Sequence, residues 1–404
     1  MTEQTAPAHR DSNPPPITRE IDLSPIQRKT VRKSVMGAMA GNAIEWFDYG
    51  IYGYLAVHLS TQIFGGSEDA ILWTLFGFAV SFLIRPIGGA ILGPLGDRIG
   101  RQKVLVFTIL MISLAAILVT ALEWIVGTEG MAAGWWRLPF LLTLPLGLVA
   151  LAMRARLHES ATFEEAKEQD TRTSAWQTLR DLVTQQPKQL LKIMGITILI
   201  NTAFYLVLTY MPTFLQTSLD MDGTQAGLML VGVQLVMMAV IIPMGALSDR
   251  IGRRPLLLTA AIGFTVCSLP AVMLLNTGTL LLQVLGLAIF GLFLVMLLCN
   301  ISASLPALFP TTVRYAGFAL GYNVATSLLG GPAGLINEAL IEQTGSTLVP
   351  GFYMTAAGII GLLAILTFNE TAGRSLRGDR VPGDDDQDRL AIGEQLIGKV
   401  AKDR

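Results

Sequence analysis

The chain has 404 residues, of which 52% are hydrophobic and 15% charged, with a formal net charge of −1 and a mean hydropathy of +0.54. Soluble domains carry about 25% charged residues. The 59 residues between Arg254 and Arg314 contain no Asp, Glu, Lys or Arg. Because a helix crosses a bilayer with about 20 apolar residues, this stretch holds two spans, with a break at 276–279. A soluble globular protein is excluded, and we predict an all-α polytopic membrane protein.

The reactive side chains do not indicate an enzyme. Cys267 and Cys299 lie inside apolar runs, where packing is the ordinary role of a cysteine, and His9, His58 and His158 are isolated in the sequence. There is no nucleophile elbow, phosphate-binding loop or metal-spaced cluster, so we predict no enzymatic activity, no cofactor and no metal. The near-zero net charge and the lack of a basic patch interleaved with aromatic residues do not indicate a nucleic-acid partner.

The apolar runs form two groups, taken here in chain order. A polar tail (1–33), without the pattern of a signal peptide, precedes a first half (34–156) with four spans. A charged linker (157–189) leads to a second half (190–369) with six spans, and a polar tail (370–404) follows. The ten predicted spans are 35–59, 70–95, 104–126, 137–156, 190–216, 224–247, 256–275, 279–305, 313–340 and 347–369.

The basic residues predict the orientation. Of 29 Lys and Arg residues, 27 fall on the side of the bundle that carries both termini; Arg85 lies within a span and Arg137 on the opposite side. Cytoplasmic loops carry the excess of basic residues. We therefore predict that both termini are cytoplasmic and that the protein lies in the inner or plasma membrane.

A short motif occurs twice, each time after the second span of a half. The first copy, Gly93-Pro94-Leu95-Gly96-Asp97-Arg98-Ile99-Gly100-Arg101, matches Gly245-Ala246-Leu247-Ser248-Asp249-Arg250-Ile251-Gly252-Arg253, 152 residues later. The glycines allow a tight turn between closely packed helices. We expect Asp97 and Asp249 to accept hydrogen bonds from the start of the next helix and to pair with the arginines.

The motif resembles the loop between the second and third helices of the major facilitator superfamily. The first span, with Gly41-Asn42-Ala43-Ile44-Glu45-Trp46-Phe47-Asp48-Tyr49-Gly50-Ile51-Tyr52-Gly53, resembles the signature of the metabolite:proton symporter family within it. The resemblance covers about residues 30 to 375. Further matching pieces are Arg85-Pro86-Ile87-Gly88-Gly89, Trp136-Arg137-Leu138-Pro139-Phe140, Glu159-Ser160, Arg314-Tyr315-Ala316-Gly317 and Glu370-Thr371-Ala372-Gly373.

This resemblance implies twelve helices, two more than the sequence contains. The second half runs 121 residues from Asp249 to Glu370, whereas the first runs 57 from Asp97 to Arg154, a shortfall of 64 residues or about two helices. By resemblance, residues 104–113 correspond to the start of the third helix and 116–124 to the end of the fifth, fused into one span. The fourth helix, which lines the cavity in this superfamily, would then be absent.

Two carboxylates inside the first span are candidates for proton coupling. Glu45, Asp48, Tyr49 and Tyr52 follow the i, i+3, i+4, i+7 pattern of one helix face, which Asn42 joins. Ionisable groups in a span usually face a cavity or a partner. Arg85 lies at a similar depth in the second span, so the carboxylates either bind the proton or form a permanent ion pair with Arg85.

Polar residues in the second half are candidates for substrate contacts. Each could bind a substrate or hydrogen-bond a neighbouring helix. They are Asn201, Tyr205, Tyr210, Gln234, Tyr322 and Asn323. Near the outer surface, Glu123 and Arg137 are expected to act as interfacial anchors.

The sequence and the resemblance together predict a proton-coupled symporter that imports a small zwitterion or organic acid by alternating access, with proline or glycine betaine first. The alternatives are a symporter for 2-oxoglutarate or another dicarboxylate, citrate or shikimate, and a truncated, transport-inactive paralogue. The expected partners are a small-molecule substrate, protons and the lipid bilayer; the oligomeric state is left open.

Overall fold

The computed structural model describes residues 46–47, 49–65, 67, 69–92, 117–139, 141, 180, 182–309 and 313–371, without side chains for 83–92, 302 and 315. Every regular element in these ranges is a helix, in agreement with the predicted all-α fold. Seven of the described helices are long and apolar enough to cross a membrane.

The second half forms six of these helices, each coinciding with a predicted span. The elements are α7 (Pro187–Tyr205), η3 (Leu206–Tyr210), α8 (Met211–Thr217), α9 (Gly223–Ile251), α10 (Arg253–Leu275), α11 (Leu280–Leu298), α12 (Ile301–Ser304), η4 (Pro306–Leu308), α13 (Arg314–Ala325), η5 (Thr326–Gly330), α14 (Ala333–Thr344) and α15 (Val349–Leu366). Local sequence sets several boundaries. Asp222 caps α9 by accepting a 3.1 Å hydrogen bond from the Gln225 backbone N–H, and Gly252, at φ 102°, separates α9 from α10.

The first half contributes three described helices. They are residues 46–64 (the 46–64 helix), α2 (Ala70–Leu92) and Ile117–Trp135 (the 117–135 helix), which ends in the π-helical turn η2 (Met131–Trp135). The span predicted to end at residue 126 continues to Trp135, because Gly127 and Gly134 adopt positive φ angles of 68° and 116° and bend the helix instead of ending it. The predicted span 137–156 lies almost wholly outside the described residues, as do both tails and most of the linker.

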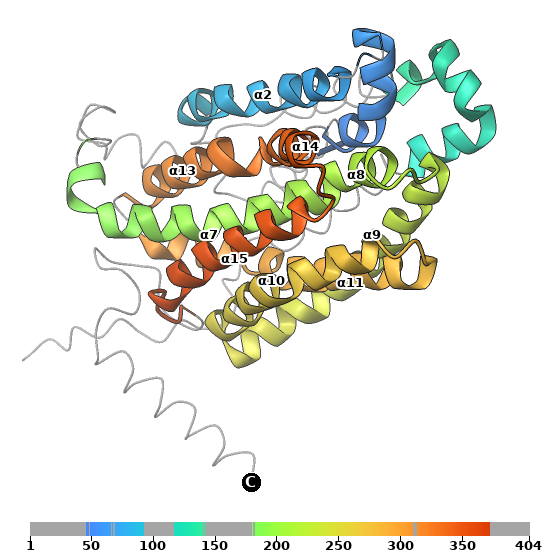
Figure 1. The fold of residues 1–404 in the computed structure, drawn as a ribbon. Helices are drawn as coiled ribbons and strands as arrows, with labels where there is room; N and C mark the ends of the chain where they lie inside the picture. Colours follow the sequence, from blue (N-terminus) through green and yellow to red (C-terminus); the bar gives the residue numbers. More distant parts are fainter. Residues whose placement is uncertain are drawn as a thin grey trace, which may run out of the picture.

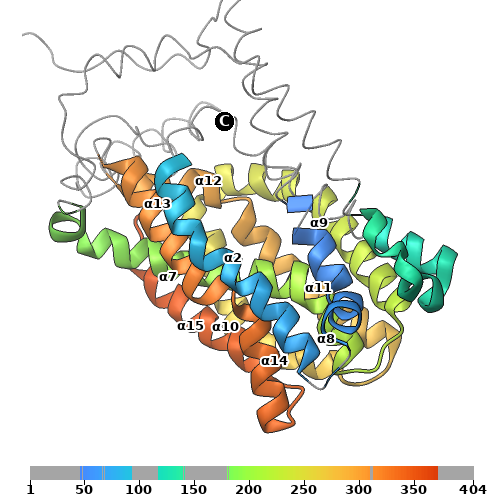
Figure 2. The same ribbon diagram turned by 90° about the horizontal axis from the view of Figure 1, so that it is seen from above.

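The central helix of the bundle is α7. It packs against α13 and α15, while α10 packs against α11 and α15, and α9 packs against α11 (Figure 1). From the first half, α2 lies along α13 and α14 in both views (Figure 2). Small residues permit close contacts between the halves: a Cβ built on Gly53 would lie 2.5 Å from the Thr209 carbonyl oxygen of η3.

The two ends of the bundle differ in charge. We call the end that carries Arg250, Arg253, Arg254 and Arg314 the basic end. Helices α7, α10 and α13 begin there. The turns between α8 and α9, α10 and α11, and α14 and α15 lie at the other end, which we call the opposite end. By the distribution of basic residues, the opposite end is predicted to face outside.

Candidate functional site

Six aromatic rings meet where the two halves join. They come from the 46–64 helix, α2 and α7, and we call them the aromatic cluster: Trp46, Tyr49, Phe78, Phe82, Phe204 and Tyr205. The ring centroids of Trp46 and Phe204 are 4.6 Å apart and those of Phe82 and Tyr205 4.8 Å apart, both edge to face. Such contacts are favourable beyond the apolar area that they bury, so the cluster joins the halves.

A polar network continues from this cluster. Asn201 lies one turn before Tyr205 on α7, donates a hydrogen bond to the Thr326 hydroxyl, and accepts one of 3.1 Å from the Tyr322 hydroxyl. The Thr326 hydroxyl in turn donates to the Tyr322 carbonyl at 2.7 Å. Of the candidate residues in the second half, Asn201, Tyr205 and Tyr322 are therefore brought together. Asn323 instead donates to the Ala319 carbonyl of its own helix at 2.8 Å.

Both broken helices change their winding at this site. The π-helical turn η3 begins directly after Tyr205, and η5 begins at Thr326. A π-helical turn inserts a residue into the helical ladder and is frequent at functional sites. On η5, the Ser327 hydroxyl lies 2.6 Å from the Phe82 carbonyl oxygen of α2, which is a direct polar contact between the halves.

In the first half, the described candidates are Tyr49 and Tyr52. Tyr49 belongs to the aromatic cluster, and the Tyr52 hydroxyl donates to the Thr74 carbonyl of α2 at 2.5 Å. Arg85 lies within α2, but its side chain is not among those described. Outside the described residues lie Asn42, Glu45, Asp48, Gly93, Asp97, Arg98, Gly100 and Arg101, so their pairing stays a prediction.

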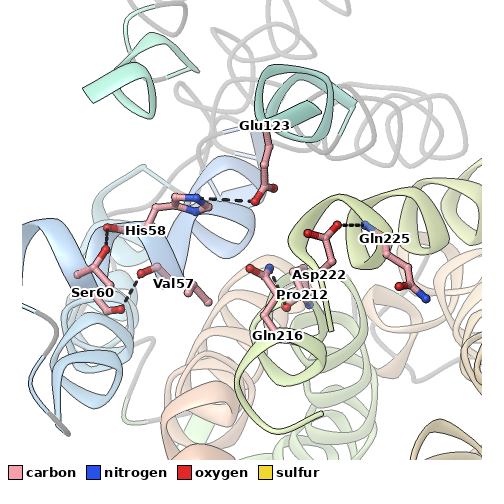
Figure 3. Close-up of polar contacts among 9 residues, drawn as sticks. Val57, His58, Ser60, Glu123, Pro212, Gln216, Asp222 and Gln225 are labelled. Atoms are coloured by element: carbon pink, nitrogen blue, oxygen red, sulfur yellow. Dashed lines mark hydrogen bonds and ion pairs between the residues drawn. The ribbon is translucent and has the colours of Figure 1, made fainter. Parts of the chain in front are cut away.

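At the opposite end, an acidic side chain of the first half lies against the second half. Glu123 of the 117–135 helix places one carboxylate oxygen 3.8 Å from the Nε2 of His58 (Figure 3). The same carboxylate lies beside Gly223 at the start of α9, close enough that a Cβ there would be 2.4 Å from it. Glu123 is 8% exposed, so its prediction as an interfacial anchor is wrong: it packs between helices. Arg137 is exposed, with its guanidinium 4.4 Å from the Trp136 ring centroid.

The second copy of the repeated motif lies at the basic end, where the acceptor predicted for the start of α10 needs correction. Asp249 and Arg250 are exposed. The carboxylate of Glu370 accepts the hydrogen bonds from the backbone N–H groups of Arg253 at 3.1 Å and Arg254 at 3.0 Å. A carboxylate at a helix N-terminus is favoured by the helix dipole. Gly252 leaves room for it, since a Cβ there would lie 2.6 Å from the Glu370 carboxylate.

The sequence analysis did not single out one buried carboxylate of the second half, Glu338 of α14. The signal was present, because an acidic residue within the predicted span 313–340 is as unusual as Glu45 or Asp48 in the first. Its partners, Tyr210 and Thr217, are more than 120 residues away in sequence and depend on the fold.

The fold and site define a polytopic helical membrane protein whose two groups of spans meet at an aromatic and amide site. The family model described as "Major Facilitator Superfamily" matches residues 121–335, and the one described as "Sugar (and other) transporter" matches residues 33–136. The chain belongs to the major facilitator superfamily, a family of transporters and not of enzymes.

Curated relatives match most of the chain. The "Ectoine/proline transporter ProP" of Corynebacterium glutamicum is 30% identical over 91% of this chain and 89% of its own. The "Glycine betaine/proline/ectoine/pipecolic acid transporter OusA" of Dickeya dadantii is also 30% identical, over 88% of this chain and 87% of its own. The "Proline/betaine transporter" of Escherichia coli K12 is 28% identical over 93% and 91%.

The fold matches a solved transporter. A crystal structure titled "D-xylose-proton symporter" superposes with a TM-score of 0.59 at 16% identity, covering 83% of this chain and 97% of that one. The alignment with the C. glutamicum relative runs over 451 positions, more than the 404 residues present here. That relative therefore has residues without a counterpart in this chain, in agreement with a shortened transporter.

Proposed function

We propose that the chain is a proton-coupled symporter that imports a small zwitterion by alternating access, with proline or glycine betaine as the first substrates. The relatives named above carry proline, betaine or ectoine in their names, and each of those solutes combines a carboxylate with a positively charged nitrogen centre. The protein would act in the inner or plasma membrane with both termini in the cytoplasm.

The observation that carries this proposal is the junction of the aromatic cluster with the Asn201 network. Aromatic faces attract cations such as a quaternary ammonium. Amide and hydroxyl donors next to them suit a carboxylate, and Asn201 and Tyr322 lie at that place on α7 and α13. Because the cluster is built from both halves, alternating access would part its rings and expose them to a substrate.

For proton coupling, the candidates are Glu45 and Asp48, with Arg85 as counter-ion. The opposing hypothesis, a permanent ion pair that holds the first two helices together, makes a different prediction. Under coupling, Glu45→Gln and Asp48→Asn lower gradient-driven uptake more than they lower expression. Under the ion-pair hypothesis both variants lower expression and uptake in proportion.

A specific observation favours a second candidate, a transport-inactive paralogue. The 117–135 helix is the only described helix between α2 and α7 that is long enough to span, and the fourth helix implied by the resemblance would be missing. Transporters for dicarboxylates, citrate or shikimate remain the alternatives in substrate, because each of these also carries a carboxylate for the same donors.

The test is uptake of labelled proline, glycine betaine and 2-oxoglutarate into cells without carriers of their own, with and without an inward proton gradient. We expect gradient-dependent uptake of a zwitterion. Trp46→Leu should then raise the KM for glycine betaine roughly tenfold, since a desolvated cation–π contact contributes about 1–2 kcal/mol.

The matched control is Trp73→Leu, because Trp73 is 54% exposed on α2 and lies outside the aromatic cluster. An equal effect of the two substitutions would argue against substrate binding at the cluster. No uptake of any of the three solutes, at normal membrane insertion, would favour the inactive paralogue.

A further inference from the structure

Glu338 is an acidic side chain buried inside the second half. It is 8% exposed on α14, whereas Asp220, Asp222, Asp249 and Glu342 in the described second half are exposed. Placing a carboxylate among apolar helices costs free energy unless it is hydrogen-bonded and either paired or protonated. Its retention at this place therefore needs a reason.

The partners of Glu338 come from the seventh and eighth elements of the chain, across the bundle. The Tyr210 hydroxyl, on the last residue of η3, donates to one carboxylate oxygen at 2.6 Å. The Thr217 hydroxyl, on the last residue of α8, lies 3.3 Å from the other. Gly334, one turn before Glu338, receives the Tyr210 ring, since a Cβ there would lie 3.2 Å from it. The carboxylate thus ties both ends of α8 to α14.

No cation compensates this charge among the described residues. The ionisable side chains beside it are Tyr210 and, one turn along its own helix, the exposed Glu342. On the packed neighbours, Lys188 and Lys192 of α7 lie at the basic end, and Tyr353 of α15 donates to the Leu329 carbonyl. Arg85 of α2 lies in the half of α2 towards the basic end, ten residues after Leu75, which faces Gly334.

We propose that Glu338 is a second proton-binding side chain of the transport cycle, located at the contact between α8 and α14. This inference rests on the proposed proton coupling. The ionised carboxylate accepts from both hydroxyls and holds α8. A proton arriving from the water at the opposite end occupies one oxygen, turns it into a donor, and removes an acceptor that α8 uses. The proton leaves when α8 returns, so no other reactant is needed.

The test compares Glu338→Gln with Glu342→Gln in proteoliposomes. Glutamine keeps the shape and an acceptor oxygen but cannot release a proton. We expect Glu338→Gln to lose gradient-driven accumulation and to keep substrate exchange without a gradient, because exchange needs no net proton movement. Glu342→Gln should keep both. Accumulation by Glu338→Gln at the wild-type level would overturn the proposal.

A second measurement covers the outcome in which Glu338→Gln loses both activities. Infrared difference spectra of the full-length protein over a pH titration should show a carboxyl band that is absent from Glu338→Gln and shifted in Tyr210→Phe. If the spectra of the wild type and Glu338→Gln are the same, Glu338 does not exchange a proton. This readout needs no transport, so it separates failure of Glu338 from failure of the proposed function.

Discussion

Asn201 illustrates how a single polar residue is used in this bundle. It is 3% exposed, and its amide is engaged on both sides by Thr326 and Tyr322 of the same broken helix. Hydrogen bonds between spans contribute about 0.6 kcal/mol on average. The contacts therefore support packing of α7 on α13 and η5, and a substrate would have to replace one of them.

Tyr322→Phe distinguishes packing from substrate binding. If the hydroxyl only supports packing, its loss should lower the unfolding free energy by about 0.6 kcal/mol and leave the KM unchanged. Thermal unfolding in detergent and uptake kinetics of the same preparation measure the two effects. A KM raised roughly tenfold with unchanged thermal stability would instead place the hydroxyl on the substrate, because tenfold corresponds to about 1.4 kcal/mol.

At this scale the sequence predicts which residues are unusual, but not their partners. Polar positions inside apolar runs identified Asn201, Tyr205 and Tyr322. The partner of Asn201 is 121 residues away, and nothing in the local pattern relates the two. Glu123 shows the reverse error: its depth along the helix was predicted near the surface, but the face that it shares with α9 depends on helix packing.

Among the elements, glycines decide how closely the halves approach. Thr120 and Glu123 of the 117–135 helix lie against Gly227 and Gly223 of α9, and a Cβ on Gly227 would fall 2.1 Å from the Thr120 hydroxyl oxygen. Small residues at such crossings let helices pack without a gap. The shortened first half is thus joined to the second by this helix pair as well as by α2.

Gly227→Val should force the 117–135 helix away from α9. Overpacking of this kind costs about 1–3 kcal/mol, so we expect lower thermal stability and at least a partial loss of uptake. Gly232→Val is the matched control on α9, because a Cβ at Gly232 has no atom within 4 Å. Equal stability of the two variants would show that the two helices do not pack closely at this crossing.

The helix boundaries could be predicted better than the contacts. Span 190–216 appears as Pro187–Thr217 and 347–369 as Val349–Leu366, because uninterrupted apolar runs have clear ends. The fused span was misjudged at residue 126, since Gly127-Thr128-Glu129-Gly130 has the composition of a turn but remains helical. The capping of α10 by Glu370 was missed because it joins residues 116 and 117 positions apart.

For the whole molecule, the shortened first half raises the question of topology. Losing two helices keeps the parity of the spans, so every later segment stays on the side that it would occupy in a twelve-helix relative. The residues on either side of the shortfall, in the loop after α2 and in the linker before α7, should then both be cytoplasmic. An odd number of lost spans would instead invert one half against the excess of basic residues.

Cysteine labelling in intact cells tests this arrangement. In a background without Cys267 and Cys299, we expect a membrane-impermeant maleimide to label Thr277→Cys, in the exposed turn between α10 and α11 at the opposite end. Gln102→Cys and Ser174→Cys should react only after permeabilisation, because ten spans place both in the cytoplasm. Labelling of Ser174→Cys from outside, with Gln102→Cys protected, would mean that an odd number of spans separates them. The halves could not then share the orientation of their relatives, and alternating access between them would lose its structural basis.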